Sequence, residues 1–396
     1  MRAVQLLPVF TLALTLGCAA PSVHRRAAEE VVWRSLTAPD AAERREATRV
    51  AVEVADPVLS EGLAQRLGDP DPTVRALAAC ALLPEVPEAR ELLRASLSSA
   101  DPAARVAALD GVGALGDGVT QAARLTTDPD QSVRARAAWM LAVLRAAEAA
   151  EYLERLLGDP APGVRAEALR ALASVTVERA AAHAESALSD AALSVRLAGL
   201  TTLARAAADH SQFRDRLLAL AGGADRFVAL RAAVHLDRLG ADALAAVENA
   251  AADRHAAVRA AAMNAAGELR ERGRALALAH LGDGDLEVRL AAARALLASG
   301  GDSGRARSVF RAALATPFRL EAADELARLG DAEGRRAVAF ATHDADATIR
   351  RSAVASLGAL SPEAPELGEA LADRDAAVRL TAARTLLRRA LRPYLR

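Results

Sequence analysis

Apolar and polar positions follow each other with the period of a helix, and one arrangement returns about every 30 residues. Each copy opens on an Asp, often followed by Pro, and continues to an apolar residue, an Arg and an Ala-rich stretch, as from Asp69 to Arg75. Counted from the Arg, positions −1, +3 and +7 are apolar or small, for example Val74, Ala78 and Leu82. Residues with this spacing lie on one face of a helix. Each copy therefore predicts a helix with one buried face.

The repeated Arg gives the number of copies. It occurs twelve times, with gaps of 28 to 35 residues, at Arg44, Arg75, Arg105, Arg134, Arg165, Arg196, Arg231, Arg259, Arg289, Arg319, Arg350 and Arg379. An Asp stands six residues before it in nine copies, at Asp69, Asp128, Asp159, Asp190, Asp225, Asp253, Asp283, Asp344 and Asp373. Because Asp accepts hydrogen bonds from free backbone N–H groups and Pro suits the first helical position, we expect each phrase to cap the helix it opens.

A second, shorter helix is expected in every copy. A turn such as Leu-Gly-Asp at residues 115–117 follows the Arg helix, and apolar stripes follow the turn, for example over residues 88–97 and 152–157. A pair of short helices cannot bury its apolar face alone, so neighbouring pairs must stack. Residues 27–36 supply the first helix, and the stacked pairs would extend on the order of 100 Å at the usual helix spacing.

Two copies depart from the pattern. The gap between Arg196 and Arg231 is 35 residues, which predicts a kink or a longer loop over residues 210–224. Before Arg319, Thr316-Pro317-Phe318 stands where the Asp phrase should be.

On these features the array resembles the HEAT-repeat family, with the short repeats also found in phycobilisome-lyase-like proteins. The resemblance implies an all-α, right-handed α-solenoid of about twelve antiparallel helix pairs over residues 27–396, an armadillo-like helical superhelix. It implies that the first helix of each pair lies on the convex side and the Asp/Arg helix on the concave side. It also implies that Asp and Arg pair in a ladder between neighbouring repeats.

Residues 1–18 have the features of an export signal. A single positive charge at Arg2 precedes an apolar run that is too short to span a bilayer, and small residues follow it around Cys18. The segment resembles a bacterial lipoprotein signal peptide, which implies that Cys18 becomes the lipidated first residue of the mature chain. Thr15 and Leu16 depart from the lipobox, where Leu and a small residue stand.

The expected location is therefore the cell envelope. We expect an exported lipoprotein, anchored by its N-terminal lipid to the outer or inner membrane and facing the periplasm or the cell surface. Residues 19–26 would form a short linker to the repeats. Secretion with cleavage near Ala19 or Ala20 and an uncleaved or cytosolic chain are the alternatives.

Composition narrows the classes of partner. The chain holds 50 basic and 51 acidic residues, a net charge of −1. A protein that follows nucleic-acid phosphates needs a one-sided basic excess, so nucleic acid is not expected as a partner. Aromatic residues make up only 3% of the chain although 52% is hydrophobic, which fits closely spaced helices packed through Ala, Leu and Val.

No catalytic, cofactor or metal site is predicted. None of the seven His is followed by Glu, and they fall at different phases of the repeat. The sequence holds no phosphate-binding loop, nucleophile elbow or zinc signature. The recurring Asp and Arg are interpreted as structural. Cys80 is interpreted as a small apolar replacement for Ala, with a reactive thiol as the alternative.

A candidate partner-binding patch follows from the repeat phase. Positions +2, +5 and +9 from the Arg should face the concave side, and the +5 position varies while the buried stripe does not. Trp and Arg dominate binding hot spots, so Trp139 with Arg136, Glu167 and Arg170 is the candidate. The alternative is that Trp139 fills a groove between helices.

The functional expectation is a protein–protein interaction scaffold rather than an enzyme, with a protein or peptide bound on the concave face and no cofactor. An enzyme-like or ligand-binding member of the family, such as a chromophore lyase, and a passive spacer are the alternatives.

Overall fold

The computed structural model describes residues 23–83, 86–145, 148–207, 211–242 and 244–391. The predicted signal peptide and Cys18 lie outside the described residues. In the described part, every regular element is a helix. None of these helices has both the length and the apolar composition needed to cross a membrane.

Twenty-four α-helices of the described residues form twelve consecutive pairs. The first helices of the pairs are α1 (Val23–Leu36), α3 (Pro57–Arg66), α5 (Pro87–Ser96), α7 (Gly118–Arg124), α9 (Ala149–Leu156), α11 (Val177–Leu188), α13 (Ser211–Ala221), α15 (Leu244–Ala251), α17 (Arg274–Ala279), α19 (Ser303–Ala313), α21 (Ala332–Ala341) and α23 (Pro365–Glu369). The second helices are α2 (Ala41–Val54), α4 (Pro72–Leu82), α6 (Pro102–Leu109), α8 (Gln131–Leu144), α10 (Pro162–Val175), α12 (Leu193–Ala206), α14 (Arg226–Arg238), α16 (Ala256–Glu268), α18 (Leu286–Ala298), α20 (Arg319–Arg328), α22 (Ala347–Leu360) and α24 (Ala376–Leu391). Helix α1 begins inside the segment 19–26 that was expected to be a linker.

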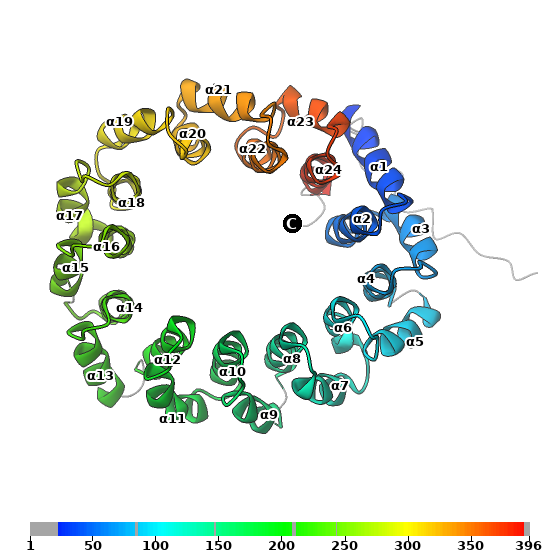
Figure 1. The fold of residues 1–396 in the computed structure, drawn as a ribbon, viewed down its shortest axis with the longest axis horizontal. Coiled ribbons are helices and arrows are strands. Elements are labelled where there is room, and N and C mark those ends of the chain that lie inside the picture. Colours follow the sequence, from blue (N-terminus) through cyan, green and yellow to red (C-terminus); the bar gives the residue numbers. More distant parts are fainter. Residues whose placement is uncertain (1–22, 84–85, 146–147, 208–210, 243, 392–396) are drawn as a thin grey trace, which may run out of the picture.

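The pairs form a closed ring. Figure 1 shows the odd-numbered helices on the outside and the even-numbered helices on the inside, with α24 returning to lie beside α1 and α2. The all-α HEAT-like solenoid of twelve pairs and the inner position of the Arg helices are therefore confirmed. Closure was not predicted, because the repeat pattern was taken to give an open superhelix.

The seam between the two ends of the ring is packed like a core. Ala28 and Val32 of α1 and Leu380 and Leu387 of α24 belong to one buried hydrophobic cluster. Polar contacts add to it, because Arg379 Nη2 donates to Glu43 Oε1 at 2.9 Å. Apolar burial, the main stabilising term in folding, therefore continues across the seam.

The predicted ladder is confirmed. The Arg105 guanidinium, which is largely buried, donates from Nε and Nη2 to the two carboxylate oxygens of Asp128 in the next repeat, both at 2.7 Å. Its Nη1 donates to the carbonyl oxygen of Ser99 at 2.7 Å, just before its own helix. The eight Arg-to-Asp rungs of the described residues are Arg44–Asp69, Arg105–Asp128, Arg134–Asp159, Arg165–Asp190, Arg196–Asp225, Arg259–Asp283, Arg319–Asp344 and Arg350–Asp373.

The expected capping role is wrong in register for these Asp residues except Asp225, which caps α14 as expected. The helix α4 is capped by Asp71, whose Oδ1 accepts from the N–H groups of Thr73 and Val74 at 3.0 Å. Asp69, two residues earlier, accepts from the Asp71 N–H at 2.9 Å, and its other hydrogen bonds come from Arg44 and Arg66. The repeated Asp therefore joins repeats, and the residue two places later begins the helix.

One member of the Arg series is out of register. Helix α14 has Asp225 as its N-cap and ends before Gly240, whose φ is +76°. Counted from either end of α14, Ala229 occupies the place of the repeated Arg, and Arg231 lies two residues further on, paired with Glu268. The expected loop over residues 210–224 is also wrong in type, because residues 211–221 form the helix α13.

Helix α20 lacks its first turn. Arg289 and Arg319 lie the same number of residues before the positive-φ glycine that follows their helix, so they hold equivalent positions in α18 and α20. However, α18 begins three residues before Arg289, whereas α20 begins at Arg319 itself. A Pro at 317 disfavours helical backbone at Thr316, so the helix cannot start there. As a result, α20 packs on α18 and α22 less extensively than the other inner helices pack on theirs.

Candidate functional site

Trp139 lies on the inner helix α8 and is 39% exposed. The Arg136 guanidinium carbon lies 4.1 Å from the centre of the Trp139 ring, close enough for a cation–π interaction. Val143, one turn further along α8, is 53% exposed. The inner face of α8 thus presents an aromatic ring partly covered by a guanidinium, with an exposed aliphatic side chain beside it.

Asp110 of the preceding inner helix holds Arg136 in place. Arg136 Nε donates to Asp110 Oδ1 at 2.6 Å, so the guanidinium bridges α6 and α8 while it lies over the indole. This arrangement leaves part of the Trp139 ring exposed and part in contact with Arg136.

Glu167 and Arg170 form a separate pair on the neighbouring helix α10. Arg170 donates to Glu167 Oε2 from Nε at 3.2 Å and from Nη2 at 2.9 Å. Among the described residues, no hydrogen bond or ion pair links this pair to Arg136 or Trp139. The four predicted residues thus occupy adjacent inner helices as two pairs (Figure 1).

The Cys80 thiol has the surroundings of a packing residue. Its Sγ donates to the carbonyl oxygen of Ala107 on α6 at 3.2 Å. Burial, and to a lesser extent the negative charge of Asp110, raises the pKa of the Cys80 thiol to about 12. The thiolate that carries cysteine reactivity is therefore scarce at neutral pH.

Burial first, and then the positive charges of Arg231 and Arg238, lower the pKa of His235 to about 4, so this imidazole is neutral at pH 7. In the described part of the chain, no group of three or more His, Cys, Asp or Glu side chains is arranged to hold a metal ion.

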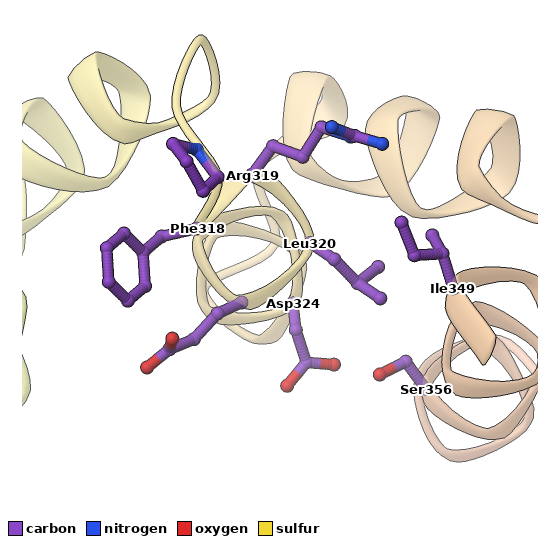
Figure 2. A pocket seen from close by; sticks show the side chains of 8 residues that line it. Phe318, Arg319, Leu320, Asp324, Ile349 and Ser356 are labelled. Carbon is purple, nitrogen blue, oxygen red and sulfur yellow. The ribbon is translucent and has the colours of Figure 1, made fainter. Parts of the chain in front are cut away.

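Sequence reasoning missed a pocket between α20 and α22. It has a volume of about 410 Å³ and is lined by Pro317, Phe318, Arg319, Leu320, Glu321, Asp324, Ile349 and Ser356. Figure 2 shows side chains of α20 facing Ile349 and Ser356 of α22 across it. The sequence signal for this pocket was the missing Asp phrase at residues 316–318, because the pocket opens beside the helical turn that is absent there.

The match to a known family covers only part of the ring. Residues 120–204 match the family of HEAT repeats. This stretch runs from α7 to α12 and contains the Trp139 patch. HEAT-repeat solenoids commonly mediate protein–protein interactions, through the extended surfaces that stacked repeats create. No curated protein matches the chain.

Solved structures of several kinds are similar in part. An engineered protein is 18% identical, with 91% of this chain and 98% of that chain covered and a TM-score of 0.32. A chain of the structure of Kap95p with RanGDP is 14% identical, with 90% and 60% covered and a TM-score of 0.42. A chain of the CpcE–CpcF complex of phycocyanin lyase from Nostoc sp. PCC7120 is 19% identical, with 76% and 99% covered and a TM-score of 0.31. At these scores the likenesses carry no information about partner or activity.

Proposed function

We propose that the chain is a protein–protein interaction scaffold that binds a protein or peptide partner on the inner face of the ring. The observation that carries the proposal is the surface of α8, a helix of the inner layer, where Trp139 and Val143 remain 39% and 53% exposed. Exposed large apolar side chains that share one face favour an interface, and Trp and Arg contribute most to binding energy.

The arrangement of Arg136 also supports binding. An arginine held over an indole by a carboxylate presents a rigid surface, so little side-chain freedom is lost when a partner docks on it. Arg170 adds a second guanidinium on the neighbouring helix, 48% exposed and paired only with Glu167 of its own helix. Its donors can turn to a carboxylate of a partner without breaking a contact between repeats.

The proposed location is the bacterial cell envelope, with Cys18 as the lipidated residue. This part rests on the sequence of residues 1–18 alone. Incorporation of labelled palmitate that is lost in a Cys18→Ala variant would support the lipid anchor, and incorporation that persists in that variant would contradict it.

We also propose that the chain is not an enzyme. The proposal rests on the sequence, in which the recurring charged residues are interpreted as structural. It also rests on the ladder, in which eight of the repeated Arg residues pair with an Asp of the next repeat. A purified protein that carries a chromophore or turns over a substrate would contradict it.

The partner site is tested by site-specific photocrosslinking in cells that make the protein. A benzoylphenylalanine placed at Val143 on the inner face should capture a discrete partner, which mass spectrometry then identifies. The matched control carries the same photoreactive group at Phe340, which is 82% exposed on the outer helix α21.

The decisive comparison uses a double variant. Trp139→Ala with Arg170→Ala should abolish the crosslinked product at position 143, while the outer-face pair Arg336→Ala with Phe340→Ala should leave it unchanged. An identical product in both double variants would reject the inner face of α8 and α10 as the binding surface.

A further inference from the structure

The pocket between α20 and α22 exists because the repeat is irregular at residues 316–318. Since α20 starts at Arg319, the turn that would pack beside the first turn of α22 is absent. Leu320 and Ile349 remain on facing sides of the space and form its apolar wall. The resulting volume of about 410 Å³ lies within the range of roughly 300 to 1,000 Å³ typical of ligand sites.

One end of the pocket is polar and carries an unsatisfied acceptor. Asp324 Oδ2 accepts a hydrogen bond from Arg328 Nε at 2.9 Å. Asp324 Oδ1 is buried and accepts no hydrogen bond within the described residues. Figure 2 shows the Asp324 carboxylate on the side of α20 that faces Ser356 of α22. Buried carboxylate oxygens are nearly always hydrogen-bonded, so this one lacks a donor.

The cations nearby are already engaged elsewhere. Arg319 lines the pocket, but its Nη2 donates to Asp344 at 2.7 Å as a rung of the ladder. Arg294 of α18 pairs with Glu321 of the pocket lining and approaches Glu325 at 3.8 Å, and no hydrogen bond or ion pair of the described residues joins it to Asp324. Burial raises the pKa of Glu325, so this carboxylate is poorly solvated.

We propose that this pocket receives an arginine side chain of the protein partner. An arginine has an aliphatic stem that packs on apolar walls and a charged head that donates hydrogen bonds, which matches an apolar wall ending at an unsatisfied carboxylate oxygen. The stem lies between Leu320 and Ile349, and the guanidinium donates to the Ser356 hydroxyl and, once the Asp324 side chain turns to expose it, to Asp324 Oδ1. The inference rests on the proposed function in one respect, namely that the arginine comes from a protein.

The sequence offers a direct probe of this pocket. Ile349 is the single isoleucine of the 396-residue chain, so labelling isoleucine methyl groups with carbon-13 gives one resonance, from the pocket wall. The probe ligand is the blocked tripeptide Ala-Arg-Ala. Two matched ligands replace its arginine by citrulline, which has nearly the same shape without the charge, or by leucine, which keeps only the apolar character.

The expected result is a saturable shift of the Ile349 methyl resonance with the arginine peptide. Binding should be at least tenfold weaker with the citrulline and leucine peptides. It should also be at least tenfold weaker in Asp324→Asn, which keeps the shape of the side chain. Glu248→Gln, which removes a carboxylate exposed on the outer helix α15, should bind like the unchanged chain.

Two results would overturn the proposal. Equal shifts with the three peptides would show a pocket that selects apolar bulk, and the absence of any saturable shift would show that it takes no such side chain. The photocrosslinking at Val143 reports on α8 and not on this pocket. If no partner is crosslinked at Val143 but the arginine peptide still shifts the Ile349 resonance, the proposed binding on α8 has failed. If a partner is crosslinked but the resonance does not shift, the proposed arginine pocket has failed.

Discussion

The ladder makes a sharp prediction at its most buried rung. Asp69 has a side chain that is 0% exposed, and that of Arg44 is 9% exposed. Asp69 accepts from Arg44 Nε at 2.9 Å and Nη2 at 3.1 Å, and from Arg66 Nη1 at 3.2 Å. Asp69→Asn keeps the shape and the hydrogen bond from the Asp71 N–H, but it leaves two arginines without their carboxylate.

The cost follows from the burial of the pair. Removal of one partner from a buried, hydrogen-bonded ion pair destabilises a protein by about 3–5 kcal/mol, because the remaining charge stays buried and uncompensated. Asp344→Asn is the matched variant at an exposed rung, since Arg319 is 50% exposed there. Exposed pairs are screened by water, so this second variant should change stability little.

The assay must resolve individual repeats, because a long array need not unfold in one step. Hydrogen exchange with mass spectrometry measures the opening of each helix. In Asp69→Asn, exchange in α2 and α4 should accelerate by about a hundredfold or more, which corresponds to about 3 kcal/mol. In Asp344→Asn, exchange in α20 and α22 should change less than about tenfold. Equal acceleration in both variants would refute the argument from burial. A double variant with Arg44→Met and Asp69→Leu should recover part of the protection, since it removes the buried Arg44 charge but leaves Arg66 and the Asp71 N–H without the Asp69 acceptor.

Three further predictions concern acid, the seam and the thiol. The Arg259 guanidinium lowers the pKa of Asp283 from 3.8 to about 2, so this carboxylate adds stability above pH 3.8 that is lost as the pH falls toward 2. In Asp283→Asn, circular dichroism during acid titration should show a helical signal that falls less steeply over this pH range. Glu43→Gln with Arg379→Gln removes one ion pair of the seam and should loosen the ring, seen as a larger radius of gyration in small-angle X-ray scattering. An unchanged radius would show that this ion pair is not needed to hold the seam. The Cys80 thiol, in a Cys18→Ala background, should react with an aromatic disulfide reagent only after urea is added, and fast reaction of the folded protein would contradict its burial.

The ladder and the inner position of the Arg helices could be predicted because each is a local property repeated many times. An Arg after an apolar residue, with an Asp in the next copy, places the same contact at eight interfaces of the described residues. The capping residue was missed by two positions because both Asp69 and Asp71 are plausible caps, and only the three-dimensional course of the turn separates them.

Closure of the ring could not be predicted, because it depends on the sum of small rotations between pairs. Its contacts also use residues outside the repeated pattern. Glu43, for example, takes the place of a ladder Asp for Arg379. The irregular copy at Arg319 was visible in the sequence, but the pocket and its unsatisfied Asp324 oxygen depend on how two helices face each other.

Because α24 lies against α1, the packing of the twelve pairs does not distinguish a first pair from a last one. Open solenoids need terminal repeats with a polar outer face, whereas here the first and last pairs cover each other. The order of the pairs along the chain is then fixed by the covalent connections between them rather than by packing. A circular permutant, with residues 391 and 23 joined by a flexible linker and new ends at the Gly300-Gly301 turn, should retain the ring. Ring folds of this kind allow the break in the chain to move during evolution while each interface is kept.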